Sequence, residues 1–378
     1  MLSIAFSLLL AFLSLCAAIE FPHTRTYFYA GGSYTQRDNG EHILTDQIYV
    51  EHLMPVSGVT QPYPILFIHG GGQTATNWLN KPDGDAGWAS FFLSRGYECY
   101  LIDQVARGRS PWQAETDSRQ KMDSTEIVQR LYTATGKYHS WPQSTKHTQW
   151  PGNGTMGDPI FDAFFASNVP YLESPTTEET LMQAAGAALI TDLDRPVIIL
   201  AHSQGGSMAW VIADAVPHLI HAIVAVEPSG PPFHNSIYLG GYSTRPYGLS
   251  NIPLKYTPPV DDPQRDLTLK IIQSKSPGGT DCIVQADIPF PRQLANLSRF
   301  PVLFITGESS FHADYDWCTV QFMRQAGMNV EHMELPKKGI QGNGHMMLLE
   351  KNSDQIAGVI HAWIERNFGH RRIREDLK

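Results

Sequence analysis

Short apolar runs alternate with helix-like stretches along most of this chain. Strands covered on both faces are predicted by six apolar runs, at residues 63–69, 97–103, 196–201, 221–226, 300–306 and 330–335. Helices are predicted by five stretches, at residues 87–96, 177–193, 207–216, 317–327 and 353–368. Because strands and helices in this alternation form parallel strands with crossover helices, the sequence predicts a doubly wound, mostly parallel α/β sheet.

Three parts of the chain depart from this alternation. Residues 33–56 predict a strand pair, with a hairpin turn at Asp38-Asn39-Gly40. Residues 109–175 and 229–297 are long connections, the second of them rich in proline and glycine. The first is aromatic and contains Trp112, Trp141, Trp150, Phe161, Phe164 and Phe165. Loops this long in a compact domain are usually lids or binding segments, so we expect both to form a cap inserted at the carboxyl ends of the strands.

The run Val197-Ile-Ile-Leu-Ala-His-Ser-Gln-Gly-Gly206 ends a predicted strand at Ser203, and a helical pattern follows directly. A sharp strand-turn-helix holds a serine hydroxyl clear of the backbone, beside a base and amide donors. Ala201 and Gly205 are small, as close packing of strand and helix around such a turn requires. An ordinary turn that happens to contain a serine remains the alternative.

Backbone donors for an anionic oxygen are predicted at His69-Gly70-Gly71-Gly72, directly after a buried strand. We expect the N–H groups of Gly71 and Gln204 to form an oxyanion hole, with Gly72 a possible third donor. A flexible glycine turn is the alternative.

The base is expected in the loop after the last strand, where His345 lies within Gly342-Asn-Gly-His-Met-Met347. His312 competes for this role, His202 is too close to the serine along the chain, and His69 suits ordering of the glycine loop better. The acid that orients the imidazole is less determined. Glu227 follows the strand at 221–226, while Glu308, Asp314 and Asp316 follow the next strand, and position along the chain leaves Glu227 and Asp314 both open.

Composition narrows the class of partner. The 378 residues are 42% hydrophobic, enough for one large domain with an insertion, and the 28 basic and 37 acidic residues give a net charge of -9. This excess of acidic residues disfavours nucleic acid and anionic membrane surfaces as binding partners. We interpret the basic cluster of Arg371, Arg372 and Arg374 as a solvated end of the chain and not as a binding patch.

The first 18 residues are apolar and end in Cys16-Ala17-Ala18, which predicts a secretory signal peptide at 1–18 and an extracellular domain at 19–378. The stretch is short for a membrane span. Of the remaining cysteines, Cys99 lies in a buried strand, so we expect Cys282 and Cys318 to form a disulfide. Asn153-Gly-Thr155 and Asn296-Leu-Ser298 are acceptor sequences for N-glycosylation in a eukaryotic host.

Several segments in combination resemble the α/β-hydrolase superfamily, and within it a group of secreted bacterial carboxylesterases. They cover most of the predicted sheet but neither cap segment, and they are His69-Gly70, Pro82-Asp-Gly84, Gly87-Trp88, Gly96-Tyr97, Ile102-Asp-Gln104, Arg107-Gly-Arg-Ser110, His202-Ser-Gln204, Val226-Glu-Pro228 and Gly342-Asn-Gly-His-Met-Met347. The resemblance implies an α/β-hydrolase fold and a glutamate acid after the sixth strand, which favours Glu227 over Asp314. In that group two adjacent cysteines follow His-Gly, where this chain has Gly71 and Gly72, so a local disulfide is missing here.

These features predict a secreted serine hydrolase that cleaves an ester or lactone through an acyl-serine intermediate. Ser203 attacks, His345 transfers the proton, Glu227 orients the imidazole, and neither a metal nor an organic cofactor is required. The aromatic cap suggests a bulky apolar or aromatic small-molecule substrate. A peptidase or amidase with the same triad and a hydrolase-fold binding protein without turnover are the alternatives. Stable membrane insertion is not expected, and a homo-oligomer is possible.

Overall fold

Eight strands form one sheet in the computed structural model, which describes residues 20–114, 118–274, 276 and 278–369. The predicted signal segment 1–18 and the basic cluster of the tail lie outside the described residues. The order across the sheet is β1-β2-β4-β3-β7-β8-β13-β14. The bounds are β1 (His23–Gln36), β2 (His42–Pro55), β3 (Ile65–Ile68), β4 (Cys99–Asp103), β7 (Val197–His202), β8 (Ile220–Val226), β13 (Pro301–Thr306) and β14 (Asn329–Glu334).

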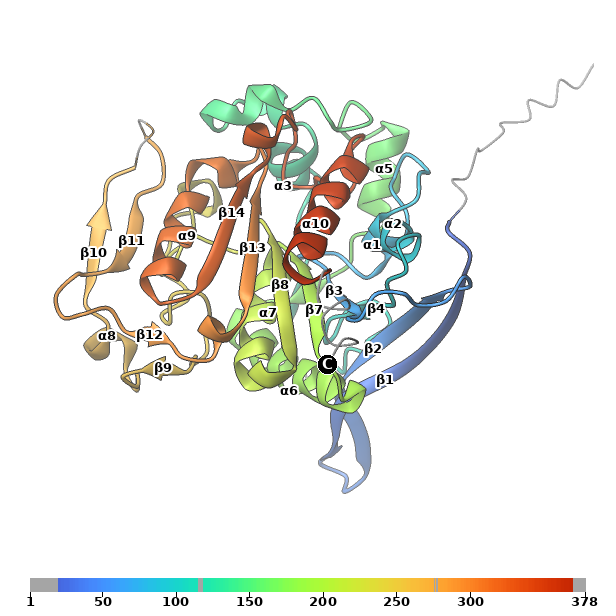
Figure 1. Cartoon of the computed structure of the whole chain (residues 1–378), viewed down its shortest axis with the longest axis horizontal. Coiled ribbons are helices and arrows are strands. Elements are labelled where there is room, and N and C mark those ends of the chain that lie inside the picture. Colours follow the sequence, from blue (N-terminus) through green and yellow to red (C-terminus); the bar gives the residue numbers. More distant parts are fainter. Residues whose placement is uncertain (1–19, 115–117, 275, 277, 370–378) are drawn as a thin grey trace, which may run out of the picture.

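Six of these strands are parallel, from β4 to β14, and only the β1–β2 pair and its junction with β4 are antiparallel (Figure 1). The predicted doubly wound, mostly parallel sheet is therefore confirmed. The order reverses beside β3, because β4 is added on one side of it and β7 on the other. Loops that leave neighbouring strands at such a point diverge and form a crevice at the carboxyl ends of the strands. The loops after β3 and β7 begin at His69 and Ser203.

Helices cover both faces of the sheet, because every central strand is apolar on both sides. On one face lie α6 (Pro175–Leu193), α7 (Gln204–Ala215) and α9 (Asp316–Gln325), and on the other lie α1 (Thr76–Leu79), α2 (Trp88–Leu93) and α10 (Ser353–Phe368). Successive residues of β7 serve opposite faces, with Ile199 in the first core and Ile198 in the second. This explains the continuous apolar runs in the sequence.

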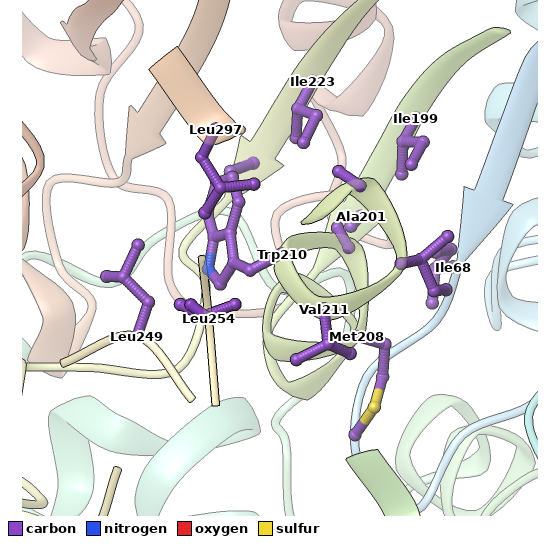
Figure 2. Close-up of a cluster of buried hydrophobic side chains, with 14 of the residues drawn as sticks. Ile68, Ile199, Ala201, Met208, Trp210, Val211, Ile223, Leu249, Leu254 and Leu297 are labelled. Carbon is purple, nitrogen blue, oxygen red and sulfur yellow. The ribbon is translucent and has the colours of Figure 1, made fainter. Parts of the chain in front are cut away.

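Helix α7, which follows Ser203, is buried on several sides. Figure 2 shows Met208 and Val211 on the same helix as Trp210, whose ring lies among Leu249, Leu254 and Leu297. All of these side chains belong to one buried cluster with Ile199 of β7. Part of the 229–297 segment thus completes the core around α7.

Residues 109–175 fold into short elements along one end of the sheet (Figure 1). These are β5 (Gln120–Lys121), α3 (Thr125–Val128), a π-helical turn (Gln129–Thr133), α4 (Thr135–Tyr138), a 3-10 turn (Pro142–Lys146), α5 (Pro159–Ala166) and β6 (Tyr171–Leu172). Among the described residues, no helix is both long and apolar enough to cross a membrane.

Residues 229–297 contain β9 (Tyr256–Thr257), α8 (Pro263–Asp266), β10 (Leu269–Ile272), β11 (Cys282–Gln285) and β12 (Gln293–Leu294). Figure 1 shows β10 and β11 beside α9, at one side of the molecule. Gln285 N donates to Gln325 Oε1 over 3.0 Å. A disulfide joins Cys282 of β11 to Cys318 of α9, with 5.4 Å between the Cα atoms, and Cys99 is a buried free thiol. This is the pairing expected from the sequence.

The disulfide closes a loop between residues 36 positions apart. Because such a cross-link restricts the unfolded chain, we expect the Cys282→Ser/Cys318→Ser variant to unfold with a free energy lower by about 3–4 kcal/mol. Denaturant titration under non-reducing conditions measures this difference. Dithiothreitol should lower the wild-type midpoint toward that of the variant and leave the variant unchanged. A wild-type midpoint that does not respond to reductant would contradict the prediction.

Candidate active site

Ser203 occupies a strained turn between β7 and α7. Its φ is 54°, in the left-handed region that costs a side-chain-bearing residue about 1–3 kcal/mol, and its N–H donates to Val226 O over 3.0 Å. The second and third residues after Ser203 must be glycine because their surroundings leave no room for a side chain. A Cβ on Gly205 would lie 2.5 Å from His69 O, and one on Gly206 would lie 2.3 Å from Pro228 Cβ. The neighbouring loop thus requires the small residue predicted at Gly205, whereas the same requirement at Gly206 was not predicted from the sequence.

Three candidate residues from three loops meet at this turn. His345 Nε2 lies 2.9 Å from Ser203 Oγ, and His345 Nδ1 lies 2.7 Å from Glu227 Oε2. Glu227 and His345 are buried. Since an ionised carboxylate only accepts hydrogen bonds, it favours the tautomer with a proton on Nδ1, which leaves Nε2 free to accept the serine proton. The arrangement can therefore generate a nucleophilic serine oxygen.

Glu227 is held in place by several donors. The Gly307 N–H donates to Oε1 over 2.8 Å, and the Ser310 hydroxyl donates to Oε2 over 2.7 Å. Burial raises the pKa of Glu227 to about 8, while His312 and these donors oppose the rise. Ser310 was not identified from the sequence, since a serine four residues beyond a strand carries no signal of its own.

His345 is held by its own loop and by stacked rings. The ring of His312 lies parallel to it, with centroids 4.8 Å apart, and Tyr132 stacks at 5.3 Å. Burial lowers the pKa of His345 well below its usual value, and His312 adds to the effect. Gly344 N donates to Glu350 Oε1 over 3.0 Å, and a Cβ on Gly344 would lie 2.8 Å from His147 Nε2. The glycine beside His345 therefore allows the loop to pack against the 109–175 segment.

The other candidate acids have different partners. Asp314 accepts from Thr280 N over 2.8 Å, and Asp316 lies 2.8 Å from His312 Nδ1. Glu308 accepts from Lys146 Nζ over 3.0 Å and from Gly342 N over 2.9 Å. Only the hydrogen bonds of Glu227 connect a carboxylate to His345 among the described residues.

The remaining histidines near the serine have structural contacts. His202 Nε2 lies 3.0 Å from His345 O, so its ring supports the histidine loop. His69 receives the Gln104 N–H on Nε2 over 3.1 Å, and burial lowers its pKa to about 3. The contacts of His69 are consistent with the ordering of the glycine loop expected from the sequence, whereas for His202 the sequence predicted only that it would not act as the base.

The glycine loop at residues 70–72 packs against the turn that carries Ser203, which we call the nucleophile turn. A Cβ on Gly70 would lie 3.0 Å from Ser203 Cβ, and one on Gly71 would lie 3.3 Å from Gln204 Oε1. In the part of the chain that the structure describes, neither the Gly71 N–H nor the Gln204 N–H has a protein acceptor. Gly72 has a φ of 67°, and its carbonyl accepts from Val169 N over 2.9 Å. Two free N–H groups beside the serine suit a developing oxyanion.

A cavity of ≈ 720 Å³ opens over Ser203 and His345. Its apolar wall comes from the 109–175 segment and includes Ile127, Val128, Leu131, Tyr132, Phe164 and Val169, and the same segment also lines the cavity with the charged residues Lys121, Asp123, Arg130 and Glu173. Its polar wall comes from residues 229–251 and includes Asn235, Thr244, Arg245 and Asn251. Among the described residues of 252–297, none lines this cavity. The later part of that segment packs beside α9 instead, so we propose the cap role for 109–175 and 229–251.

The aromatic residues of the 109–175 segment are mostly structural. Trp141 and Trp150 are buried, and they pack on Phe311 and Phe164 respectively. Of the six aromatic residues noted in the sequence, Phe164 alone lines the cavity. Aromatic content within a segment does not show which rings face a ligand, since the same residues also form cores.

One group of side chains has the composition of a metal site. Donor atoms of Glu227, His312 and His345 lie within 4.8 Å of one another. Both nitrogens of His345 are already engaged, one with Glu227 and the other with Ser203. The cluster is therefore explained by the hydrogen-bonded serine, histidine and glutamate, with His312 stacked beside them.

Comparisons with known proteins place the chain in a family. A model of the alpha/beta hydrolase family matches residues 65–359. A probable secreted lipase, phiG, of a fungal species (strain ATCC 74256) is 44% identical over 342 residues, covering 90% of this chain and 89% of the relative. A bacterial esterase solved at atomic resolution superposes with a TM-score of 0.61 at 24% identity, covering 93% of this chain and 98% of the esterase, and this likeness supports the fold.

The electrostatics of the site predict a pH dependence. Ser203 becomes nucleophilic when Glu227 is ionised and His345 is neutral. Because the pKa of Glu227 is raised to about 8, the rate at which a fluorophosphonate labels Ser203 should rise with pH and level off above about that value. Loss of the Ser310 hydroxyl removes a donor to the carboxylate, so Ser310→Ala should raise the pKa further and shift this rise to higher pH.

Ser309→Ala is a matched control, since the Ser309 hydroxyl is buried and has no partner among the described residues. Its labelling profile should coincide with that of the wild type. Labelling rates measured by mass spectrometry across the pH range test both variants. A Ser310→Ala profile that shifts toward lower pH would show that the hydroxyl does not stabilise the carboxylate.

Proposed function

The chain belongs to the α/β-hydrolase family, and on this premise we propose that it hydrolyses carboxylic esters through an acyl-serine intermediate. The observation that carries the proposal is the hydrogen-bonded line from Ser203 through His345 to Glu227 at the floor of a cavity. The relative named as a probable secreted lipase supports an ester as the substrate.

In the proposed reaction Ser203 Oγ attacks the ester carbonyl while His345 Nε2 takes the hydroxyl proton. Glu227 stabilises the imidazolium that results, and the Gly71 and Gln204 amides donate to the oxyanion, with Gly72 as a further candidate. His345 then gives the proton to the leaving alcohol, and an acyl-serine remains. Water, activated by His345, releases the acid in the second half of the reaction. Lactones undergo the same two steps, with the alcohol still attached to the acyl group.

The cavity supports a substrate larger than a short-chain ester. Its volume of ≈ 720 Å³ and its apolar wall of Leu131, Tyr132 and Phe164 suit a bulky apolar acyl or alcohol group. Because Trp141 and Trp150 do not line the cavity, the proposal rests on this wall and not on the tryptophans.

Substitution of the nucleophile tests the reaction. Ser203→Ala should lower kcat on p-nitrophenyl esters by about 10⁴-fold to 10⁶-fold, because the covalent route is lost. Turnover across a series of acyl lengths, with matched amides beside the esters, measures both the chemistry and the size preference. Retention of wild-type turnover in Ser203→Ala would reject the proposal, and faster cleavage of the amides would favour a peptidase.

We also propose that the protein is secreted, as the apolar segment 1–18 and the secreted relative suggest. The two glycosylation sequences differ in exposure. Asn153 is exposed, whereas the side-chain nitrogen of the half-buried Asn296 donates to Asp214 O over 2.8 Å.

Because a glycan is attached to that nitrogen, we expect Asn153 and not Asn296 to carry one when a eukaryotic host secretes the protein. Peptide mass mapping before and after treatment with a glycosidase distinguishes the two positions. An Asn153→Gln variant should then lose the glycan, whereas Asn296→Gln should keep it. A glycan found on Asn296 would contradict this assignment.

A further inference from the structure

A buried ionic network lies behind the glycine loop and the nucleophile turn. Arg107, in the loop after β4, forms an ion pair with Glu178 of α6, and both side chains are fully buried. Arg107 Nη1 also donates to Gly70 O over 2.9 Å, and Nη2 donates to Gln204 Oε1 over 2.6 Å. Gln204 Nε2 closes the ring by donating to Glu178 Oε2 over 2.6 Å.

The network contacts the peptide unit that carries the first proposed oxyanion donor, the Gly71 N–H. It also contacts the side chain of Gln204, whose backbone N–H is the second proposed donor. The Gly70 carbonyl and the Gly71 N–H belong to one planar trans peptide unit, so they point in opposite directions. Gly70 and Gly71 line the cavity, whereas neither Arg107 nor Glu178 does among the described residues. By holding the Gly70 carbonyl behind the cavity wall, Arg107 therefore turns the Gly71 N–H toward the cavity.

The second donor is fixed through its side chain. Gln204 is the first residue of α7, where the N–H has no partner within the helix. Its side-chain amide is held on one side by Arg107 and on the other by Glu178. One guanidinium thus connects the loop that carries the first donor to the residue that carries the second.

We propose that Arg107, held by Glu178, is a positioning residue that sets the relative placement of the Gly71 and Gln204 amides. A planar guanidinium supplies several donors in fixed directions, which suits simultaneous contact with Gly70 O, Gln204 Oε1 and Glu178 Oε1. The inference rests on the proposed function, since an oxyanion hole matters only if Ser203 attacks a carbonyl.

The experiment compares Arg107→Lys and Gln204→Met with the wild type. Lysine keeps the charge beside Glu178 but cannot reach all three acceptors, and methionine removes the clamped amide while the backbone N–H remains. We expect each variant to lower kcat on the best p-nitrophenyl ester by about 10-fold to 100-fold, below the full loss of an oxyanion donor. KM should stay within about twofold, because the ground-state carbonyl depends little on these amides.

A trifluoromethyl ketone provides a second readout that a purely structural role would not change. It forms a hemiketal with Ser203 whose oxyanion occupies the same position as that of the reaction, so its affinity should fall by a factor similar to kcat. Arg195→Lys is the matched control, because Arg195 pairs with Glu98 at the opposite end of the strands. It should leave both kcat and ketone affinity unchanged.

The outcomes distinguish failure of the role proposed for Arg107 from failure of the proposed function. Unchanged kcat and ketone affinity in both variants, with Ser203→Ala inactive, would overturn the role of Arg107 and leave the proposed function intact. Loss of kcat without loss of ketone affinity would also overturn it. Turnover that persists in Ser203→Ala would remove both proposals. If Arg107→Lys does not fold, Gln204→Met alone decides, since it leaves the Arg107–Glu178 pair in place.

Discussion

The structure depends on close backbone approach around the turn that carries Ser203. The left-handed φ of Ser203 holds its hydroxyl above the sheet, and the strain is tolerated because packing on every side fixes the turn. Gly205 approaches the carbonyl of His69, and Gly206 approaches Pro228, which directly follows Glu227. The loops after β3, β7 and β8 are thereby brought into contact, and these are the loops that hold the amide donors, the serine and the carboxylate.

Burial then sets the electrostatic properties of the site. Glu227 and His345 share a hydrogen bond away from water, so the pKa of the first is raised and that of the second is lowered. The same low-polarity environment makes the Arg107–Glu178 pair sensitive to the loss of either member. One network joins Glu227 to His345, and the other lies behind Gly71 and Gln204. Both networks join residues in loops that follow different strands. The distances within each network therefore depend on the arrangement of the strands in the sheet.

The two long insertions differ in how much of each lines the cavity. Residues 109–175 supply the apolar wall of the cavity, and their tryptophans form packing contacts beneath it. Residues 229–251 supply the polar wall, while 252–297 extend the core around Trp210 and attach to α9 through the disulfide. Both segments therefore contribute to the surface that a substrate in the cavity would contact.

The sequence by itself determined the order of the elements, because short apolar runs such as 196–201 and 221–226, alternating with longer helical patterns, are typical of strands buried on both faces. It also indicated Ser203 and the glycine loop, since each lies directly after a strand, where local chain geometry places functional groups, and it indicated His345 in the longer loop that follows the last strand. Spacing along the chain left Glu227 and Asp314 open, because it says nothing about which carboxylate reaches the imidazole, and the resemblance to a known family favoured Glu227. Only the tertiary structure decided that Glu227 contacts His345, that Asp316 pairs with His312, and that Arg107 reaches Gly70 and Gln204. The physical reason is that a hydrogen bond depends on distance and direction between side chains from separate strands, and only the packing of the folded chain determines these.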